Sequence, residues 1–141
     1  MNLQDSGILL YCVAAAAALI YLPFLVVGYA RVSVGYDIGA PRAMFDKLPP
    51  YGQRATWAHQ NSFEAFTLFA PAALMAYVTG QNSSLAIGVA IAHIIARFFY
   101  SFFYIFNIPL ARSLMFAIGS FCSATLFVLS LLSANHPIKL L

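Results

Sequence analysis

Four long stretches of apolar residues follow one another along the chain, separated by polar connections. A transmembrane helix needs about 20 mostly apolar residues, and each stretch is long enough to supply them. Within lipid the backbone must satisfy its own hydrogen bonds, which favours helices over an open sheet. The pattern therefore predicts an all-α, integral membrane four-helix bundle formed by a single domain, residues 1–141. The predicted helices cover about 8–30, 57–78, 85–106 and 110–133.

The connections between the predicted helices differ in length. Residues 31–56 are rich in glycine, proline and charge, whereas 79–84 and 107–109 are short turns. No basic residue precedes the first apolar stretch, and this stretch is longer than the apolar core of a secretory signal. We therefore expect the first stretch to be a transmembrane helix that the protein retains.

The composition supports a lipid environment and excludes some classes of function. The chain is 62% hydrophobic and only 8% charged, whereas soluble domains contain about 25% charged residues. Its lysines and arginines form no basic cluster interleaved with aromatic residues, so we expect no nucleic-acid partner. Cys12 and Cys122 lie within apolar stretches without the spacing of metal ligands. We expect them to be buried thiols, and we expect no metal site.

The distribution of positive charge predicts how the chain crosses the membrane. Cytoplasmic loops carry an excess of lysine and arginine. The long connection 31–56 holds four such residues, and Arg112 adds one at the turn on the same side. The opposite side has no basic residue before the first helix, an uncharged turn at 79–84, and Lys139 near the C-terminus. The loop 31–56 is therefore predicted to be cytoplasmic, and both termini non-cytoplasmic.

Two stripes of polar residues interrupt the apolar helices. Arg54, Asn61 and Glu64 recur on one face of the second helix, because steps of seven and three return to the same stripe. His93, Arg97, Tyr100 and Tyr104 form a stripe on the third helix, and Arg112 and Ser113 open the fourth. At about 1.5 Å per residue, most of these groups lie within the cytoplasmic third of the bilayer. We therefore expect the second and third helices to face each other, with Glu64 and Arg97 as a charge pair.

This polar layer has two interpretations. An ionisable group inside a membrane costs roughly 2.5–3.5 kcal/mol on insertion scales, so each needs a partner or a purpose. Glu64 and Arg97 could simply neutralise each other and set the register of the helices. Alternatively, the layer lines a polar cavity that binds a small charged molecule from the cytoplasm. We favour the cavity, because the layer holds more polar groups than one charge pair requires.

The histidines do not indicate a haem or a metal. His59 lies near the start of the second predicted helix, where we expect an interfacial hydrogen bond. His93 lies much deeper, and this mismatch argues against a haem held by the two rings. His136 lies near the C-terminus, and we expect it to be solvated.

The polar run from Arg54 to Glu64, read as RATWAHQNSFE and followed by Phe66 and Pro71, resembles the signature of the MAPEG family. These are membrane-associated proteins in eicosanoid and glutathione metabolism. The Arg97/Tyr104 pair and the adjacent Arg112 and Ser113 extend the resemblance, which covers nearly the whole chain. The chain looks closest to a bacterial member, which implies a multi-pass protein of the bacterial inner membrane.

The resemblance implies a homotrimer that binds glutathione as co-substrate between neighbouring subunits near the cytoplasmic face. Arg112 matches the arginine proposed to hold the glutathione sulfur as thiolate, because a nearby cation lowers the pKa of a thiol from about 8.5. The implied activity is that of a transferase or peroxidase acting on hydrophobic electrophiles or lipid hydroperoxides from the bilayer. The implied binding residues are Arg54, Asn61, Glu64, Arg97, Tyr104 and Ser113.

Three positions depart from this pattern. Trp57 and Gln60 stand where glutathione-using members have arginines, and Phe116 replaces a tyrosine of the prostaglandin-forming type. An alternative function is therefore a non-catalytic protein of the same fold. Such a protein would be an accessory subunit or a scaffold among other membrane proteins, and its polar layer would be structural.

Overall fold

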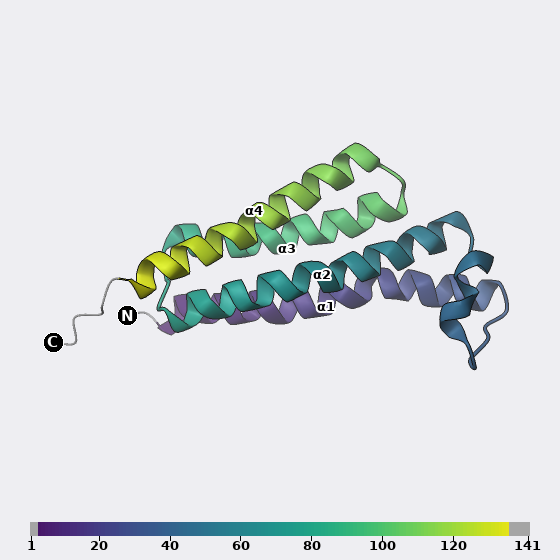
Figure 1. Ribbon diagram of the computed structural model, residues 1–141, viewed down its shortest axis with the longest axis horizontal. Coiled ribbons are helices and arrows are strands. Elements are labelled where there is room, and N and C mark those ends of the chain that lie inside the picture. Colours follow the sequence, from purple (N-terminus) through teal and green to yellow (C-terminus); the bar gives the residue numbers. More distant parts are fainter. Residues whose placement is uncertain (1–2, 136–141) are drawn as a thin grey trace.

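The computed structural model describes residues 3–135 as an elongated bundle of four long α-helices (Figure 1). Consecutive helices run in opposite directions, α1 packs along α2, and α3 packs along α4. The predicted all-α fold is confirmed. His136 and Lys139, and the expectations for them, lie outside the described residues. The elements are α1 (Leu3–Ser33), the 3₁₀ helix η1 (Pro41–Lys47), α2 (Pro50–Val78), α3 (Ser84–Ile105) and α4 (Pro109–Ala134).

Three of the four helices are long and apolar enough to cross a membrane by themselves, and the protein is an integral membrane protein. These are Gly7–Ser33 of α1, α3 and α4. The α2 helix is not among them, contrary to the expectation of four apolar spans, because Gln60, Asn61 and Glu64 lower its hydropathy. It nevertheless runs back alongside α1 and ends where α3 begins, so it covers the same thickness as the apolar helices (Figure 1).

Two helices extend beyond their predicted limits. The α1 helix continues to Ser33 and begins at Leu3, and α2 begins at Pro50 instead of near residue 57. A hydropathy pattern detects only the apolar part of a helix, whereas the first turns of α2 are polar. Proline suits the first position of a helix, since its missing N–H would have no partner there. The long connection therefore shrinks to 34–49, and η1 occupies part of it.

Small residues allow the helices to pack closely. The core of the bundle contains many alanines from α1, α2 and α3, and Phe69 is its largest fully buried side chain. Gly52 marks a close approach of α2 to α1, because a Cβ there would lie 2.7 Å from the Cβ of Ala30. Cys12 and Cys122 are free, buried thiols, as predicted.

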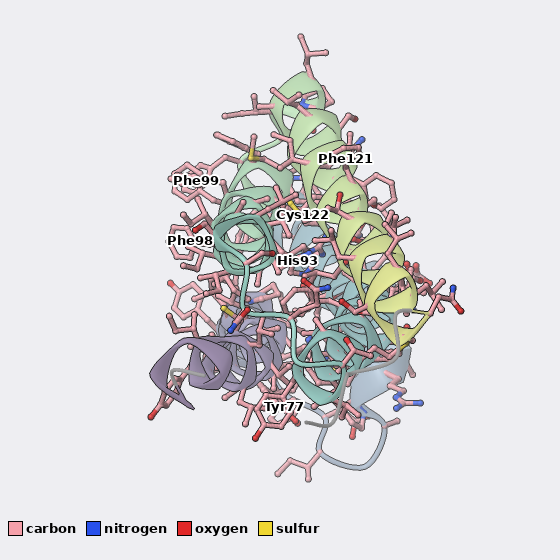
Figure 2. The ribbon with its side chains drawn as sticks, turned by 90° about the vertical axis from the view of Figure 1, so that its left-hand side faces the viewer. Tyr77, His93, Phe98, Phe99, Phe121 and Cys122 are labelled. Carbon is pink, nitrogen blue, oxygen red and sulfur yellow. The ribbon has the colours of Figure 1, made fainter. Side chains whose placement is uncertain are left out.

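Aromatic side chains cover the outside of the bundle, where lipid would surround it. Figure 2 shows Phe98, Phe99 and Phe121 pointing away from the helices, whereas His93 lies between them. Each of these three phenylalanines is at least 42% exposed, and His93 is 2% exposed. An apolar exterior, with polar residues such as His93 buried between the helices, is the arrangement expected of a protein dissolved in a bilayer.

A histidine on α2 forms a hydrogen bond with α1 close to Pro23. Pro23 removes one backbone N–H donor from the helix. In the same turn, the Nδ1 atom of His59 on α2 lies 2.7 Å from the carbonyl oxygen of Ile20. A carbonyl can only accept, so this ring nitrogen donates. The hydrogen bond predicted for His59 is confirmed, and it ties α2 to α1.

Candidate functional site

The two polar stripes meet at one contact between α2 and α3. Arg97 Nη2 donates a hydrogen bond to Asn61 Oδ1 over 2.9 Å, and Asn61 Nδ2 donates to Glu64 Oε2 over 3.0 Å. The predicted facing of the second and third helices is thus confirmed. The link between the charges differs from the prediction, because Asn61 stands between Arg97 and Glu64 and bridges them.

The side chain of Arg97 is held on several sides. It is only 5% exposed, and its guanidinium carbon lies 4.0 Å from the centre of the Tyr100 ring. Such cation–π contacts stabilise a desolvated cation by about 2 kcal/mol. On α4, the absence of a side chain at Gly119 leaves room for the arginine stem, since a Cβ there would lie 3.4 Å from Arg97 Cδ. The position of Arg97 is therefore set by α2, α3 and α4 together.

Beside this contact lies a polar hollow with a volume of about 260 Å³. Side chains from α2, α3 and α4 form its wall, so the hollow depends on the packing of three helices. It presents an amide, three hydroxyl groups and a guanidinium to one space. The lining residues are Asn61, Tyr100, Tyr104, Arg112, Ser113 and Phe116.

Arg112 is the cation of the polar hollow. It lies in the first turn of α4, and its guanidinium carbon is 4.6 Å from the centre of the Tyr104 ring. A ring face holds the flat guanidinium without using its N–H donors, which lie in the guanidinium plane. Arg112 can therefore direct several hydrogen bonds to an anion in the hollow.

Four predicted site residues line this polar hollow, and two others are hydrogen-bonded to one of its lining residues. Asn61, Tyr104, Arg112 and Ser113 form part of the wall. Arg97 and Glu64 are linked to the hollow by their hydrogen bonds to Asn61.

Arg54 is placed differently from the other predicted site residues. Its Nε donates to the carbonyl oxygen of Ile105 over 2.9 Å. Ile105 is the last residue of α3, where carbonyl groups lack partners within the helix. Arg54 therefore caps α3 and lies outside the lining of the polar hollow.

Two lining residues were not among the predicted site residues. Tyr100 belongs to the polar stripe of α3 and lies between Arg97 and Tyr104. Its helical spacing from these two residues could therefore have identified it as a site residue. Phe116 follows Arg112 by one helical turn and lies on the same face of α4. The ring centres of Tyr100 and Phe116 are 6.4 Å apart, so aromatic surface forms part of the wall of the hollow.

His93 does not line the polar hollow and instead packs between the helices. Its ring stacks on that of Phe69 with centres 3.9 Å apart and planes only 5° from parallel. Its Nδ1 lies 3.0 Å from the carbonyl oxygen of Gly119 and therefore donates to it. His93 thus links α2, α3 and α4.

Comparison with known proteins supports the resemblance seen in the sequence. The family model described as the MAPEG family matches residues 8–132, which include all residues of the polar hollow. No significant match is found among curated proteins or among solved structures.

Proposed function

The chain belongs to the MAPEG family, and on this premise we propose that it is a membrane-embedded, glutathione-dependent transferase or peroxidase. Its substrates would be hydrophobic electrophiles or lipid hydroperoxides dissolved in the bilayer. Glutathione-related transferases and peroxidases are typical of this family. The observation that carries the proposal is the placement of Arg112 in one polar hollow with Asn61, Tyr104 and Ser113.

The position of Arg112 in the hollow supports a role in thiolate formation. Its charge would stabilise the ionised form of a thiol in the hollow and lower the pKa of that thiol. The thiolate would then attack an electrophilic carbon, forming the carbon–sulfur bond as the bond to the leaving group breaks or the strained ring opens. With a hydroperoxide, two glutathione molecules would be oxidised to the disulfide, yielding an alcohol and water.

The remaining polar groups could bind the ammonium, amide and carboxylate groups of glutathione. Glu64 is exposed beside the hollow, and its carboxylate can accept hydrogen bonds from an ammonium group. Asn61 and the hydroxyl group of Ser113 offer both donors and acceptors. These residues would orient the tripeptide so that its sulfur reaches Arg112.

We also propose that the functional unit is a homotrimer with glutathione between neighbouring subunits. Glu64 is exposed on the single subunit although it lies within a helix that runs through the bundle. A carboxylate that faces lipid is costly even with the hydrogen bond from Asn61, so a neighbouring subunit is the natural cover for it. The polar hollow also has two exposed lining residues, Ser113 and Phe116.

The proposed orientation places the loop end of the bundle, which carries 34–49 and the turn between α3 and α4, in the cytoplasm. Arg42 and Lys47 are exposed at this end. Glutathione would then enter the hollow from the cytoplasm, and the hydrophobic substrate would enter from lipid. A bacterial inner membrane is the proposed location.

One observation favours a non-catalytic alternative. The bridge from Arg97 through Asn61 to Glu64 satisfies its own polar groups without any ligand. Uncharged Trp57 and Gln60 also remove two cations that could bind the carboxylates of glutathione. In this alternative the polar layer stabilises a scaffold or an accessory subunit within a larger membrane assembly.

Glutathione binding by the purified protein in detergent separates the two functions. We expect saturable binding at or below millimolar glutathione, weakened at least tenfold in Arg112→Ala, since hydrogen bonds to charged groups contribute about 1.5–3 kcal/mol. Lys47→Gln is the matched control, because Lys47 is an exposed cation outside the hollow. Absence of saturable binding would contradict the enzyme proposal. Loss of the trimer without loss of binding in Glu64→Gln would favour the scaffold.

A further inference from the structure

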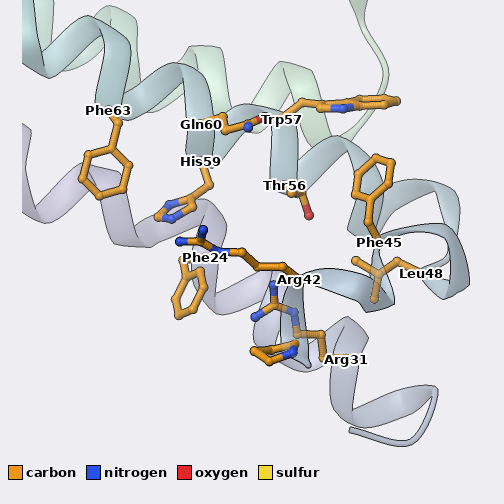
Figure 3. A pocket seen from close by; sticks show the side chains of 11 residues that line it. Phe24, Arg31, Arg42, Phe45, Leu48, Thr56, Trp57, His59, Gln60 and Phe63 are labelled. Atoms are coloured by element: carbon orange, nitrogen blue, oxygen red, sulfur yellow. The ribbon is translucent and has the colours of Figure 1, made fainter. Parts of the chain in front are cut away.

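A larger groove lies at the loop end of the bundle and shares no lining residue with the polar hollow. Its volume is about 720 Å³. The end of α1, the 3₁₀ helix η1 and the first half of α2 form its walls (Figure 3). The lining residues are Phe24, Arg31, Pro41, Arg42, Phe45, Leu48, Thr56, Trp57, His59, Gln60 and Phe63.

Two arginines give the groove its charge. Figure 3 shows Arg31 from α1 and Arg42 from η1 reaching into the same space. None of the described residues that line the groove is acidic. Two neighbouring cations without a carboxylate repel each other, so an anion between them would be favoured.

Arg31 shows where that anion would bind. Its Nε is buried away from solvent and has no hydrogen-bond partner among residues 3–135. A buried donor without an acceptor costs about 1–3 kcal/mol. The guanidinium carbon lies 5.9 Å from the centre of the Phe24 ring, which holds the flat group on one face. A rotation of the side chain that turns this edge toward the groove would let an anion remove the cost, and phosphate oxygens match the geometry of a guanidinium.

The rest of the groove is aromatic and apolar. Phe24, Phe45 and Phe63 line it together with Trp57, whose ring centre is 5.6 Å from that of Phe45. Tryptophan is typical of the level at which lipid headgroups meet the hydrocarbon region, and the phenylalanine rings offer apolar surface to an acyl chain. The groove therefore combines a cationic site for a phosphate with an apolar path into the bilayer, which fits an amphiphilic anion better than a fully polar ligand.

We propose that this groove binds the phosphate headgroup of an anionic phospholipid from the leaflet at the loop end. The phosphate lies between Arg31 and Arg42, and an acyl chain runs past Phe24 and Phe63 into the membrane. Basic pockets of transmembrane proteins bind lipid headgroups in this way. The ring centre of Trp57 is also 6.4 Å from that of Tyr104, so one aromatic contact joins the groove to the polar hollow. The proposal does not depend on glutathione chemistry.

Trp57 provides a direct probe, because it is the single tryptophan of the chain and lines the groove. The protein is reconstituted in nanodiscs that contain phosphatidylcholine and phosphatidylglycerol, with bromine on the acyl chains of one lipid at a time. Brominated chains quench tryptophan fluorescence on contact. We expect brominated phosphatidylglycerol to occupy the groove about 25-fold more than brominated phosphatidylcholine at equal mole fraction, since Arg31 and Arg42 each contribute about 1 kcal/mol, or about fivefold, toward anionic lipid.

Matched variants test the role of the two arginines. Arg31→Gln and Arg42→Gln should each lower the preference for the anionic lipid about fivefold, whereas Lys47→Gln should preserve it. Lys47 belongs to the same connection but does not line the groove. Arg42 is exposed, so its variant tests the proposal even where Arg31→Gln fails to fold.

Four outcomes would overturn the proposal. The first is equal quenching by the two lipids in the unaltered protein, and the second is an equal loss of preference in Lys47→Gln. The third is reversal of the quenching by millimolar inorganic phosphate, which would identify free phosphate as the ligand. The fourth is found by adding glutathione. Glutathione binding that persists in Arg112→Ala but is lost in Arg31→Gln would assign the groove to glutathione. Failure of glutathione binding at the polar hollow would leave the lipid preference unchanged.

Discussion

Arg97 and Asn61 join α3 to α2 through a hydrogen bond of 2.9 Å between Nη2 and Oδ1. The same asparagine donates to the exposed carboxylate of Glu64, so one amide serves two opposite charges. This arrangement keeps the buried cation satisfied and leaves the carboxylate available beside the polar hollow. The bridge is therefore both a helix–helix contact and one wall of the candidate site.

Removal of this amide should destabilise the bundle. Asn61→Ala deprives the buried Arg97 of an acceptor, which we expect to lower the free energy of unfolding in detergent micelles by about 1–3 kcal/mol. Gln60→Ala is the control, because Gln60 is the preceding residue and is exposed. Its effect should stay within about 0.5 kcal/mol. Equal losses in the two variants would show that the bridge does not stabilise the fold.

The close approach of α1 and α2 should make Gly52 intolerant of a side chain. In Gly52→Ala the new Cβ would lie 2.7 Å from Ala30 Cβ and 3.3 Å from Leu48 Cβ, so the helices must move apart. Overpacking of this kind costs about 1–3 kcal/mol, measured as a lower midpoint of thermal unfolding. Gly28→Ala should be neutral or slightly stabilising, since nothing lies within 4 Å of its Cβ position. A neutral Gly52→Ala would contradict the packing of α1 against α2.

The proposed orientation can be tested by labelling of introduced cysteines. Both natural cysteines are buried, so a membrane-impermeant thiol reagent should report mainly on a new one. In spheroplasts, Asn82→Cys should react, whereas Lys47→Cys should react only after the membrane is permeabilised. Both positions are exposed. Labelling of Lys47→Cys in intact spheroplasts would reverse the orientation.

Trp57 offers a test by gain of affinity. Its ring centre lies 6.4 Å from that of Tyr104, which lines the polar hollow. An arginine at this position could reach a carboxylate of glutathione, and we expect Trp57→Arg to tighten binding about tenfold. Trp57→Gln removes the ring without adding a cation and is the control. Equal affinity of the two variants would mean that glutathione does not extend toward this residue.

The helices could be predicted from the sequence because lipid imposes both their length and their apolar surface. The facing of Asn61 and Arg97 could also be predicted, since helical period and depth placed them together. Arg97 and Glu64 were predicted to form a charge pair, and the place of Asn61 between them was not predicted, because side-chain reach decides whether an amide comes between two charges. Helical spacing predicts only which faces of two helices lie against each other.

Other features carry no signal in the sequence. Arg54 binds the backbone carbonyl of Ile105, and a backbone acceptor is the same at every residue. The start of α2 at Pro50 escaped prediction because this turn lies outside the apolar span. The groove at the loop end arises from the packing of η1 against α1 and α2, which no local pattern in residues 31–56 indicates.

The central claim is that Arg112 holds the sulfur of glutathione as thiolate, and ultraviolet absorbance of the bound thiolate tests it most directly. Titration of the protein–glutathione complex should give a thiol pKa well below the value of about 8.5 for a free thiol. In Arg112→Ala, saturated with glutathione, the pKa should return toward that value, whereas Arg112→Lys should give an intermediate one. S-Methylglutathione serves as the spectroscopic blank. An unchanged, low thiol pKa in Arg112→Ala, or a pKa near 8.5 in the unaltered protein, would contradict the proposed function.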